Sequence, residues 1–381
     1  MDFGFTAEQK ALRETVRRYL NDKIAPIADD YDRRGFLTKQ EALGFMQQLK
    51  PFGFVASEVP VELGGAGLDC MTSGILIEEI MRVYASLGNV FVIGNDNINL
   101  IARCENAPLR DRILPGLVSG EKIICSAITE PDHGSDTAIE TKAVLEGDYY
   151  RINGTKMWIS NGSIADYVIV LAKTETAEGM IRILVEQDKS PFAANDIHKL
   201  GLRSSPVSEL VFEDCMVPKE NLINSAGGRK DTLKDLGHAR IMVALASVGL
   251  AQAALEAAIQ YAKERIQFKR PIASFQLIQS MIAEMATDLD AARLLCYRVC
   301  DLYDKGIPCR KEGSMAKAYA TEMGIRVTSK AIQVHGAYGL ADEYKVERFF
   351  RDARVLNIPD GTTQIQNLII GRELLGMQAF V

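Results

Sequence analysis

The residues with the clearest chemical potential lie near the end of the chain, between Asn357 and Gln366. This stretch reads Asn-Ile-Pro-Asp-Gly-Thr-Thr-Gln-Ile-Gln, so one carboxylate, Asp360, stands among small hydroxyl and amide side chains. Pro-Asp-Gly is first of all a turn signal. The same composition also suits a loop that places a carboxylate and several hydrogen-bonding groups beside a bound ligand. The stretch therefore predicts a ligand-binding loop, provided that the remainder of the chain supports it.

The spacing of the histidines and cysteines does not predict a metal site. The histidines are His133, His198, His238 and His335, and the cysteines are Cys70, Cys104, Cys125, Cys215, Cys296, Cys300 and Cys309. The cysteines include no Cys-x-x-Cys pair, and their scatter is typical of reduced, mostly buried thiols. We predict that the protein binds no metal.

The length, composition and net charge of the chain narrow the class of protein to which it can belong. The chain has 381 residues, 47% of them hydrophobic and 25% charged, which predicts a soluble globular protein of two or three domains. A net charge of -6 gives no electrostatic reason to expect nucleic acid or an anionic membrane as partner. We find no apolar run that approaches membrane-spanning length, and Met1–Phe5 is not a signal peptide. We therefore expect a cytoplasmic protein.

The elements that must position the loop fall into three consecutive blocks. Residues 1–120 have helical periodicity. Residues 121–225 are rich in strand patterns, among them a predicted hairpin over 148–159 whose turn is Asn153-Gly154. Residues 226–381 contain four long helical segments, which predict an antiparallel bundle. The expected fold is mainly α with a middle β-domain.

Two segments carry a family resemblance. Residues 127–136 read Ala-Ile-Thr-Glu-Pro-Asp-His-Gly-Ser-Asp, and residues 333–340 read Gln-Val-His-Gly-Ala-Tyr-Gly-Leu. They resemble the two signatures of the acyl-CoA dehydrogenase family, with His133 and Ala337 replacing small residues that are usual there. Residues 158–160, 265–268 and 361–366 match further family segments, in family order. The resemblance covers essentially the whole chain. It implies an N-terminal helical domain, a middle β-barrel or sandwich domain and a C-terminal four-helix bundle.

The resemblance also implies a chemistry. The family binds FAD noncovalently and oxidises an acyl-CoA thioester between Cα and Cβ. A carboxylate removes the α-proton, the β-hydrogen leaves as hydride to flavin N5, and donors polarise the thioester carbonyl. The implied partners are the acyl-CoA substrate, electron-transfer flavoprotein and further copies of the chain, in at least a dimer and by expectation a homotetramer.

The resemblance implies roles for particular residues. The expected cofactor-binding residues are Ile128, Thr129, Ser135, Trp158, Ser160, Arg265, Gln267, Phe268, Gln276, Gln333, Gly336, Thr362 and Gln364. The expected substrate-binding residues are Ser135, Ser204, Arg240 and Gly361, while the backbone at Asp136 is expected near the cofactor. The segment from Arg265 to Phe268 is expected to reach the FAD of a neighbouring subunit. Taken singly, such residues also have structural interpretations: Trp158 alone could be a core aromatic residue.

Asp360 departs from the family pattern. The usual base is a glutamate at this position, and the shorter side chain withdraws the carboxylate by about 1.5 Å. A misplacement of about 1 Å can cost roughly 100-fold in rate. Either the pocket is reshaped so that the Asp360 carboxylate reaches the α-proton, or another group removes that proton. Some family members carry the base just before the arginine at position 240, but Ala239 stands there. We predict that Asp360 is the base.

Asp96 is a second departure. Its helix lines the floor of the family's acyl pocket, where apolar residues are usual. The string Gly94-Asn95-Asp96-Asn97 has a turn-like composition, which favours a turn or cap residue. The alternative is a second carboxylate facing the substrate. Together, Asp96 and Asp360 resemble the alicyclic subgroup, which acts on cyclohexane- and cyclohexene-carboxyl-CoA and uses aspartate as base.

The sequence thus predicts a dehydrogenase of short or alicyclic acyl-CoA thioesters with Asp360 and Asp96 as catalytic residues. Two alternatives stay open. The first is an enoyl-CoA reductase that runs the same chemistry backwards. The second is a catalytically weakened family member that serves as a binding subunit, an interpretation that the replacement of glutamate by Asp360 keeps open.

Overall fold

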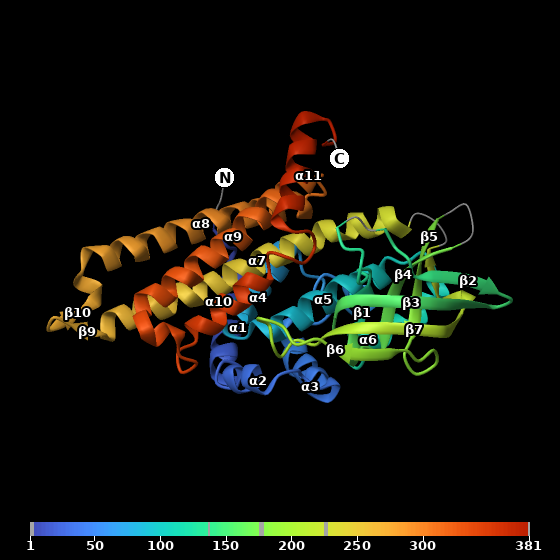
Figure 1. Ribbon diagram of the computed structural model, residues 1–381, viewed down its shortest axis with the longest axis horizontal. Coiled ribbons are helices and arrows are strands. Elements are labelled where there is room, and N and C mark those ends of the chain that lie inside the picture. Colours follow the sequence, from blue (N-terminus) through green and yellow to red (C-terminus); the bar gives the residue numbers. More distant parts are fainter. Residues whose placement is uncertain (1–3, 136–137, 175–178, 225–227, 380–381) are drawn as a thin grey trace.

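The computed structural model describes residues 4–135, 138–174, 179–224 and 228–379. A β-domain lies at one end of the long axis, and helices extend from it to the other end (Figure 1). The first block is helical, as expected. Its helices are α1 (Ala7–Lys23), α2 (Ala28–Arg34), α3 (Lys39–Leu49), α4 (Cys70–Val83), α5 (Ala85–Ala102) and α6 (Ala107–Val118).

Local sequence explains where these helices begin. The Thr6 hydroxyl accepts a hydrogen bond from Gln9 N while the Gln9 side chain accepts one from Thr6 N, which is a capping box at the start of α1. Asp69 caps α4 by accepting from Thr72 N at 2.7 Å. Helix α4 is buried along most of its length because α1, α5, α7 and α8 all pack against it. The N-terminal block is therefore continuous with the C-terminal helices through α4.

The middle block forms one sheet in the order β6-β7-β3-β2-β4-β5-β8, with β1 pairing in parallel with β4. The strands are β1 (Ile124–Ala127), β2 (Lys142–Glu146), β3 (Tyr149–Ser160), β4 (Tyr167–Lys173), β5 (Met180–Glu186), β6 (Ala193–Asp196), β7 (Val207–Pro218) and β8 (Leu222–Asn224). They surround their own apolar core, which is separate from that of the helices.

The predicted hairpin turn at Asn153-Gly154 is wrong. Strand β3 runs straight through these residues and pairs with the equally long β7, with a register shift between Ile152 and Gly154. Gly154 has φ +153°, and a Cβ there would lie 2.5 Å from the Thr141 hydroxyl oxygen. The Asn-Gly pair therefore marks a bulge in a long strand rather than a reversal of the chain.

The C-terminal block is built around one long buried helix. Helix α7 (Gly228–Glu264) packs against α8 (Gln276–Asp304), α9 (Arg310–His335) and α10 (Val346–Val355). The two-residue strands β9 (Ile266–Gln267) and β10 (Arg270–Pro271) form the connection from α7 to α8. Helix α11 (Thr363–Leu375) contacts α9 and projects from the bundle near the C-terminus (Figure 1).

Helix α7 corrects one expectation about apolar length. Residues Asp231–Glu264 are long and apolar enough to cross a membrane by length and composition alone. In the structure, 83% of the most apolar window is buried inside the protein. This segment is a core helix surrounded by other helices, which explains its alanine-rich and aliphatic sequence.

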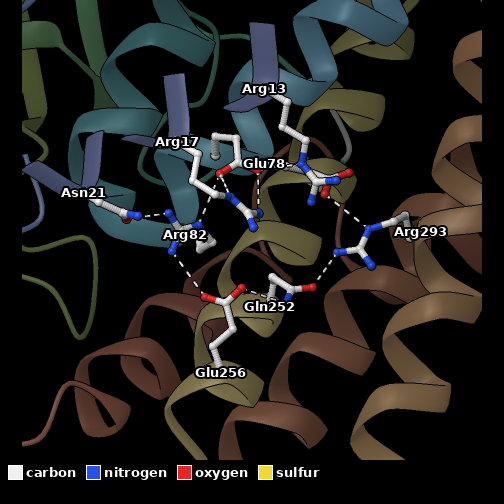
Figure 2. Close-up of polar contacts among 9 residues, drawn as sticks. Arg13, Arg17, Asn21, Glu78, Arg82, Gln252, Glu256 and Arg293 are labelled. Carbon is white, nitrogen blue, oxygen red and sulfur yellow. Dashed lines mark hydrogen bonds and ion pairs between the residues drawn. The ribbon is translucent and has the colours of Figure 1, made fainter. Parts of the chain in front are cut away.

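A buried charge network joins α1, α4, α7 and α8 (Figure 2). Glu79 on α4, only 1% exposed at its side chain, accepts from Arg13 at 2.8 Å, from Arg17 at 2.7 Å and from Arg82 at 3.3 Å. Arg82 continues the network to Glu256 of α7 at 3.2 Å. Arg293 of α8 contacts Glu78 of α4 at 3.3 Å and donates to Gln252 of α7 at 2.9 Å, and Gln252 in turn donates to Glu256 at 2.9 Å. Together these contacts fix the first helix to the central bundle.

We expect Glu79→Gln to destabilise the protein by roughly 3–5 kcal/mol, because it leaves three arginines around a site that has lost its charge. Thermal or denaturant unfolding measures the change. Glu14→Gln, at an exposed position of α1, is the matched control and should stay within about 0.5 kcal/mol of wild type. Equal stability of the two variants would contradict the central place given to Glu79.

Candidate active site

Asp360 lies in the loop between α10 and α11, on strained backbone. Its φ is +55° and that of Gly361 is +94°, so two consecutive residues occupy the left-handed region. Aspartate tolerates that region better than most residues that carry a Cβ. Thr362 then caps α11, accepting from Ile365 N at 3.4 Å. This geometry explains locally why Asp-Gly, a turn signal, stands in the loop.

Three side chains from three helices hold the backbone of this loop. Lys317 Nζ of α9 donates to the carbonyl oxygens of Asn357 at 3.1 Å and Gly361 at 2.7 Å. Gln366 Nε2 of α11 donates to the carbonyls of Asp360 at 3.1 Å and Gly361 at 2.8 Å. Arg240 Nε of α7 donates to the Asp360 carbonyl at 3.0 Å. All three donors are buried, so the backbone that carries the Asp360 side chain is held by the core.

Burial raises the pKa of Asp360 to about 6, and the negative charge of Asp96 adds to this increase. Lys317 and Arg240 oppose it with their positive charges. Burial in turn lowers the pKa of Lys317 to about 8. A carboxyl group that titrates near neutral pH is suited to act as a general base.

The same pKa predicts a stability effect. Because the folded pKa of about 6 lies above the ordinary value of 3.8, folding favours the protonated form of Asp360. The stability contributed by this group is present below pH 3.8 and lost as the pH rises through 6. We therefore expect Asp360→Asn to raise the free energy of unfolding by on the order of 1–3 kcal/mol at pH 7.5 and by little at pH 4. Thermal unfolding at both pH values measures this; a lower Tm than wild type at pH 7.5 would contradict it.

Asp96 lies within α5, so the interpretation as a turn residue is wrong. The neighbouring polar side chains are occupied in holding the helix. The Asn95 side chain accepts from Ala56 N at 2.8 Å and donates to the Phe54 carbonyl at 2.9 Å, and Asn97 Nδ2 donates to the Ile93 carbonyl at 2.8 Å. The turn-like composition thus reflects hydrogen bonds to the surrounding backbone, formed without a break in the helix.

Asp96 forms a polar cluster with two residues that sequence reasoning assigned no role. Its Oδ1 lies 2.8 Å from His238 Nδ1, and His238 Nε2 lies 2.9 Å from Glu58 Oε1. Burial acts to lower the pKa of His238, but the charges of Glu58 and Asp96 outweigh it and hold that pKa well above its usual value. His238 is separated from its partners by 142 and 180 residues, so no spacing signal could have revealed the cluster.

The cluster borders a small hollow between α4, α5 and α7. The lining residues are Ser57, Glu58, Ser73, Ile77, Val92, Asn95, Asp96, His238 and Met242. The negative charge of Asp96 also contributes to the raised pKa of Asp360, the predicted base. The lining is therefore mostly polar and charged, and Ile77, Val92 and Met242 are its apolar members.

Within the described residues, Glu58, Cys70 and His238 bring possible metal-ligand atoms within 4.8 Å of one another. Both ring nitrogens of His238 already face carboxylates. A hydrogen bond to Cys300, with burial, raises the pKa of Cys70 well above its usual value and keeps it a thiol. Thiolate is the form that binds metals. The absence of a metal stays a prediction, which this geometry favours.

Several predicted cofactor residues gather at one end of the β-domain. Lys156 Nζ donates to the Ile128 carbonyl at 3.0 Å, and Met157 N donates to the Thr129 carbonyl at 2.8 Å, so this loop is fixed against β3. Trp158 on β3 has φ +63° and is 57% exposed, which excludes a core role. Ser160 ends the same strand. An exposed indole beside a fixed loop fits a flat aromatic cofactor.

The structure does not test the roles expected of Ser135, Asp136 and Ser204. Ser135 is exposed, and Asp136 lies outside the described residues. Ser204 is fully buried, and its hydroxyl lies 2.7 Å from that of Tyr84. Its side chain therefore has a partner within the fold, and its contact with substrate stays a prediction. The role expected of Ser135 stays a prediction as well.

A second group of predicted cofactor residues lies at the opposite end of the molecule. Arg265, Gln267 and Phe268 occupy the connection through β9 and β10, which Figure 1 shows at the far end from the β-domain. Phe268 is 85% exposed, and the Arg265 guanidinium lies 5.1 Å from the ring centroid of Tyr338. The remaining positions of this group, all exposed, are Gln276, Gln333 and Gly336. One chain does not bring these residues to Trp158, so a joint site requires a second copy.

The base loop supplies a third group. Gly361 offers its carbonyl to Lys317 and Gln366, and Thr362 caps α11. Gln364 is exposed on the first turn of α11. Arg240, expected to contact substrate, here donates to the backbone of Asp360. The structure thus brings Asp360, Gly361 and Arg240 together. Asp96 is linked to them through the effect of its charge on the pKa of Asp360. The individual roles of these residues stay predictions.

Comparison with known proteins places this geometry in a family. Residues 6–121, 125–215 and 226–375 match the N-terminal, middle and C-terminal domains of acyl-CoA dehydrogenase. An acyl-CoA dehydrogenase of Bacillus subtilis (strain 168) is 36% identical over 97% of this chain and 99% of its own length. Subunit CarC of the caffeyl-CoA reductase-Etf complex of Acetobacterium woodii is 37% identical over 97% of this chain and 99% of its own.

A solved glutaryl-CoA dehydrogenase of Mycobacterium smegmatis in complex with FADH2 superposes with a TM-score of 0.94 at 27% identity, covering 99% of this chain and 97% of its own. These matches confirm the predicted fold of a helical domain, a middle β-domain and a C-terminal helical domain. The chain belongs to the acyl-CoA dehydrogenase family, the FAD-dependent oxidoreductases that act on the CH–CH group of acyl-CoA thioesters.

Proposed function

We propose that this protein dehydrogenates short or alicyclic acyl-CoA thioesters, such as cyclohexane- or cyclohexene-carboxyl-CoA, with Asp360 as the base at the α-carbon. The observation that carries the proposal is the state of Asp360. Its backbone is held by Lys317, Arg240 and Gln366, and burial raises its pKa to about 6. This arrangement also argues against a weakened binding subunit, because an unused carboxylate would gain nothing from strained backbone and a costly environment.

The cofactor contacts follow from the exposed groups. FAD, when bound, supplies the acceptor for the β-hydrogen as hydride. Trp158 covers one side of the cofactor site, and the loop at Ile128 and Thr129 offers its backbone. Arg265, Gln267 and Phe268 complete the site from a second copy of the chain, since they lie at the far end of their own (Figure 1). We therefore propose at least a dimer and, as in the sequence expectation, a homotetramer.

Asp96 limits the length and shape of the acyl group that we expect the protein to accept. A carboxylate beside an apolar acyl chain is costly unless it is protonated, paired or used, and Asp96 is paired with His238 through one oxygen only. A long straight chain laid over Asp96, His238 and Glu58 would remove water from three charged groups and offer no hydrogen bond in return. A compact ring covers fewer of these charged groups and presents a ring C–H to Asp96. Short and alicyclic thioesters are therefore the favoured substrates.

Electron-transfer flavoprotein is the proposed redox partner, and the cytoplasm is the proposed location. A second direction of reaction has specific support. The relative in Acetobacterium woodii is named as a subunit of a caffeyl-CoA reductase-Etf complex, and a relative of 36% identity in Clostridium sporogenes is named 3-(aryl)acrylate reductase. Reduction of an enoyl-CoA thioester in the same site is accordingly the second candidate function.

We expect the purified protein to be yellow, to carry about one FAD per chain and to be at least dimeric. Anaerobic mixing with a panel of straight, branched and cyclic acyl-CoA thioesters should bleach the flavin, fastest with compact acyl groups. Reoxidation of the reduced enzyme by unsaturated thioesters then measures the opposite direction. A colourless monomer that cannot be reconstituted with FAD, or fastest bleaching by octanoyl- or palmitoyl-CoA, would contradict the proposal.

A further inference from the structure

Resting on the proposed function, we propose that His238 and Glu58 are positioning residues that act on the reaction through Asp96. A protonated His238 holds Asp96 as an oriented carboxylate at the floor of the acyl pocket, and Glu58 keeps His238 protonated. We call these three residues the Asp-His-Glu clamp. The clamp sets the pH range over which compact acyl groups react.

The geometry of the ring nitrogens carries the proposal. The three members of the clamp come from different parts of the fold: Asp96 from α5, His238 from α7 and Glu58 from the segment before α4. Each ring nitrogen lies within 2.9 Å of a carboxylate oxygen. A neutral imidazole has one N–H, whereas the imidazolium ion has two. Only the protonated ring donates to both carboxylates.

All three side chains of the clamp are largely buried, so their charges are weakly screened. An aspartate, an imidazolium and a glutamate leave one net negative charge in the pocket. Burying such a group is costly unless every charge is paired. Apolar residues of similar size would avoid this cost, and Ile77, Val92 and Met242 already line the same hollow. The presence of three buried charges here is therefore better explained by a function than by packing.

Other titratable groups also lie around His238, on each neighbouring element. Tyr303 of α8 has its ring centroid 5.1 Å from that of His238, and the charge of His238 influences Cys309. Asp304 accepts from Cys70 N at 2.7 Å and from Met71 N at 3.1 Å, and it feels the charge of Glu58. Asp304 adds negative charge on the Glu58 side, which further favours the imidazolium. On its own helix, Arg240 follows His238 by two residues and points to the base loop.

The second oxygen of Asp96 is the part that meets the acyl group. Oδ1 is occupied by His238, and in the part of the chain that the structure describes no hydrogen bond reaches Oδ2. The negative charge of Asp96 also raises the pKa of Asp360. If His238 lost its proton, Asp96 Oδ1 would lose its cationic hydrogen-bond partner, and the bond that orients the carboxylate would weaken. Activity toward a ring held over Asp96 would then fall as His238 deprotonates.

Three variants of the FAD-loaded enzyme test the clamp. Glu58→Gln removes the negative charge that holds the proton on His238, and Glu58→Asp restores that charge with a shorter side chain. Glu62→Gln is the matched control, four residues along the same segment and exposed. Imidazole nitrogen NMR on histidine-labelled protein measures the charge of His238, and His238→Gln identifies its signals among the four histidines.

In wild type, and in Glu62→Gln, we expect His238 to remain an imidazolium well above the pH at which an ordinary histidine titrates. In Glu58→Gln its titration should move down toward the ordinary value of about 6.5. Bleaching by the best compact thioester should then decline at least tenfold between about pH 6 and pH 8.5 in this variant but not in wild type. Glu58→Asp should recover most of the wild-type profile.

An ordinary titration of His238 in wild type would overturn the proposal. So would a Glu58→Gln enzyme whose bleaching keeps the wild-type pH profile although His238 titrates early. Protein-bound zinc in stoichiometric amount would also overturn it, since the metal would then occupy the ring nitrogen. If no thioester bleaches wild type, the proposed function fails and the clamp's effect on the reaction fails with it. The NMR titration separates these cases, because it reports the charge of His238 without any turnover. Should Glu58→Gln not fold, Glu58→Asp and wild type still give the titration that decides the charge.

Discussion

Asp360→Asn is expected to keep FAD and thioester binding but to lose reductive bleaching by roughly 10²–10⁴-fold, the usual contribution of a general base. Asparagine tolerates the left-handed backbone of Asp360 as well as aspartate does, so the loop should stay in place. Its amide cannot accept the α-proton. Anaerobic stopped-flow absorbance at the flavin band measures the loss, with Asp290→Asn at an exposed position of α8 as control. Bleaching of Asp360→Asn at the wild-type rate would show that another group is the base.

Asp360→Glu extends this test. It restores the residue usual in the family and adds one methylene, but at φ +55° a longer side chain is less well tolerated. The loop backbone cannot easily move to compensate, because Lys317, Arg240 and Gln366 all hold its carbonyl groups. We expect Asp360→Glu to bleach more slowly than wild type with compact thioesters. Faster bleaching would mean that the pocket is not reshaped around aspartate.

Asp96→Ala is expected to shift the substrate preference from compact thioesters toward straight-chain thioesters such as octanoyl-CoA. Removing the carboxylate leaves an apolar surface on α5 over which a straight chain can lie without removing water from a charge. Turnover of octanoyl-CoA should therefore improve, while turnover of the best compact thioester should fall. We expect the ratio of the two kcat/KM values to change by at least about tenfold, which is within the range that pocket contacts supply.

Asp96→Asn is the companion variant, because it keeps the size of the side chain and a hydrogen bond to His238. It should lose activity toward rings but gain less toward octanoyl-CoA than Asp96→Ala does. Steady-state kinetics on the two thioesters measure both variants. A substrate profile that neither variant changes would remove Asp96 from the substrate site and leave it a structural residue of α5.

The order of helical, β and helical blocks could be predicted because each element has its own periodicity. The loop at Asp360 could be predicted for a related reason: its composition departs from both periodicities and concentrates polar groups next to helices. Its strained backbone could not be foreseen in detail, because three donors from distant parts of the chain hold it.

The errors arose where tertiary pairing overrode a local signal. Asn153-Gly154 is a strong hairpin pattern, but β7 offers β3 a partner of equal length, and the pair becomes a bulge. The string around Asp96 reads as a turn, but its asparagines find backbone partners while α5 continues. The cluster of His238 with Asp96 and Glu58 could not be predicted, because both partners are more than a hundred residues away from His238 in the sequence.

The most direct test of the central claim, that Asp360 removes the α-proton of a compact thioester, is an isotope effect. Cyclohexanecarboxyl-CoA carrying deuterium only at the α-carbon is mixed anaerobically with wild-type enzyme, and flavin bleaching is compared with that by thioester labelled only at the ring γ-carbons. We expect the α-label to slow bleaching through a primary isotope effect and the γ-label to leave the rate nearly unchanged. Bleaching slowed by the γ-label and not by the α-label would assign the proton removal to Asp96 and contradict the role of Asp360.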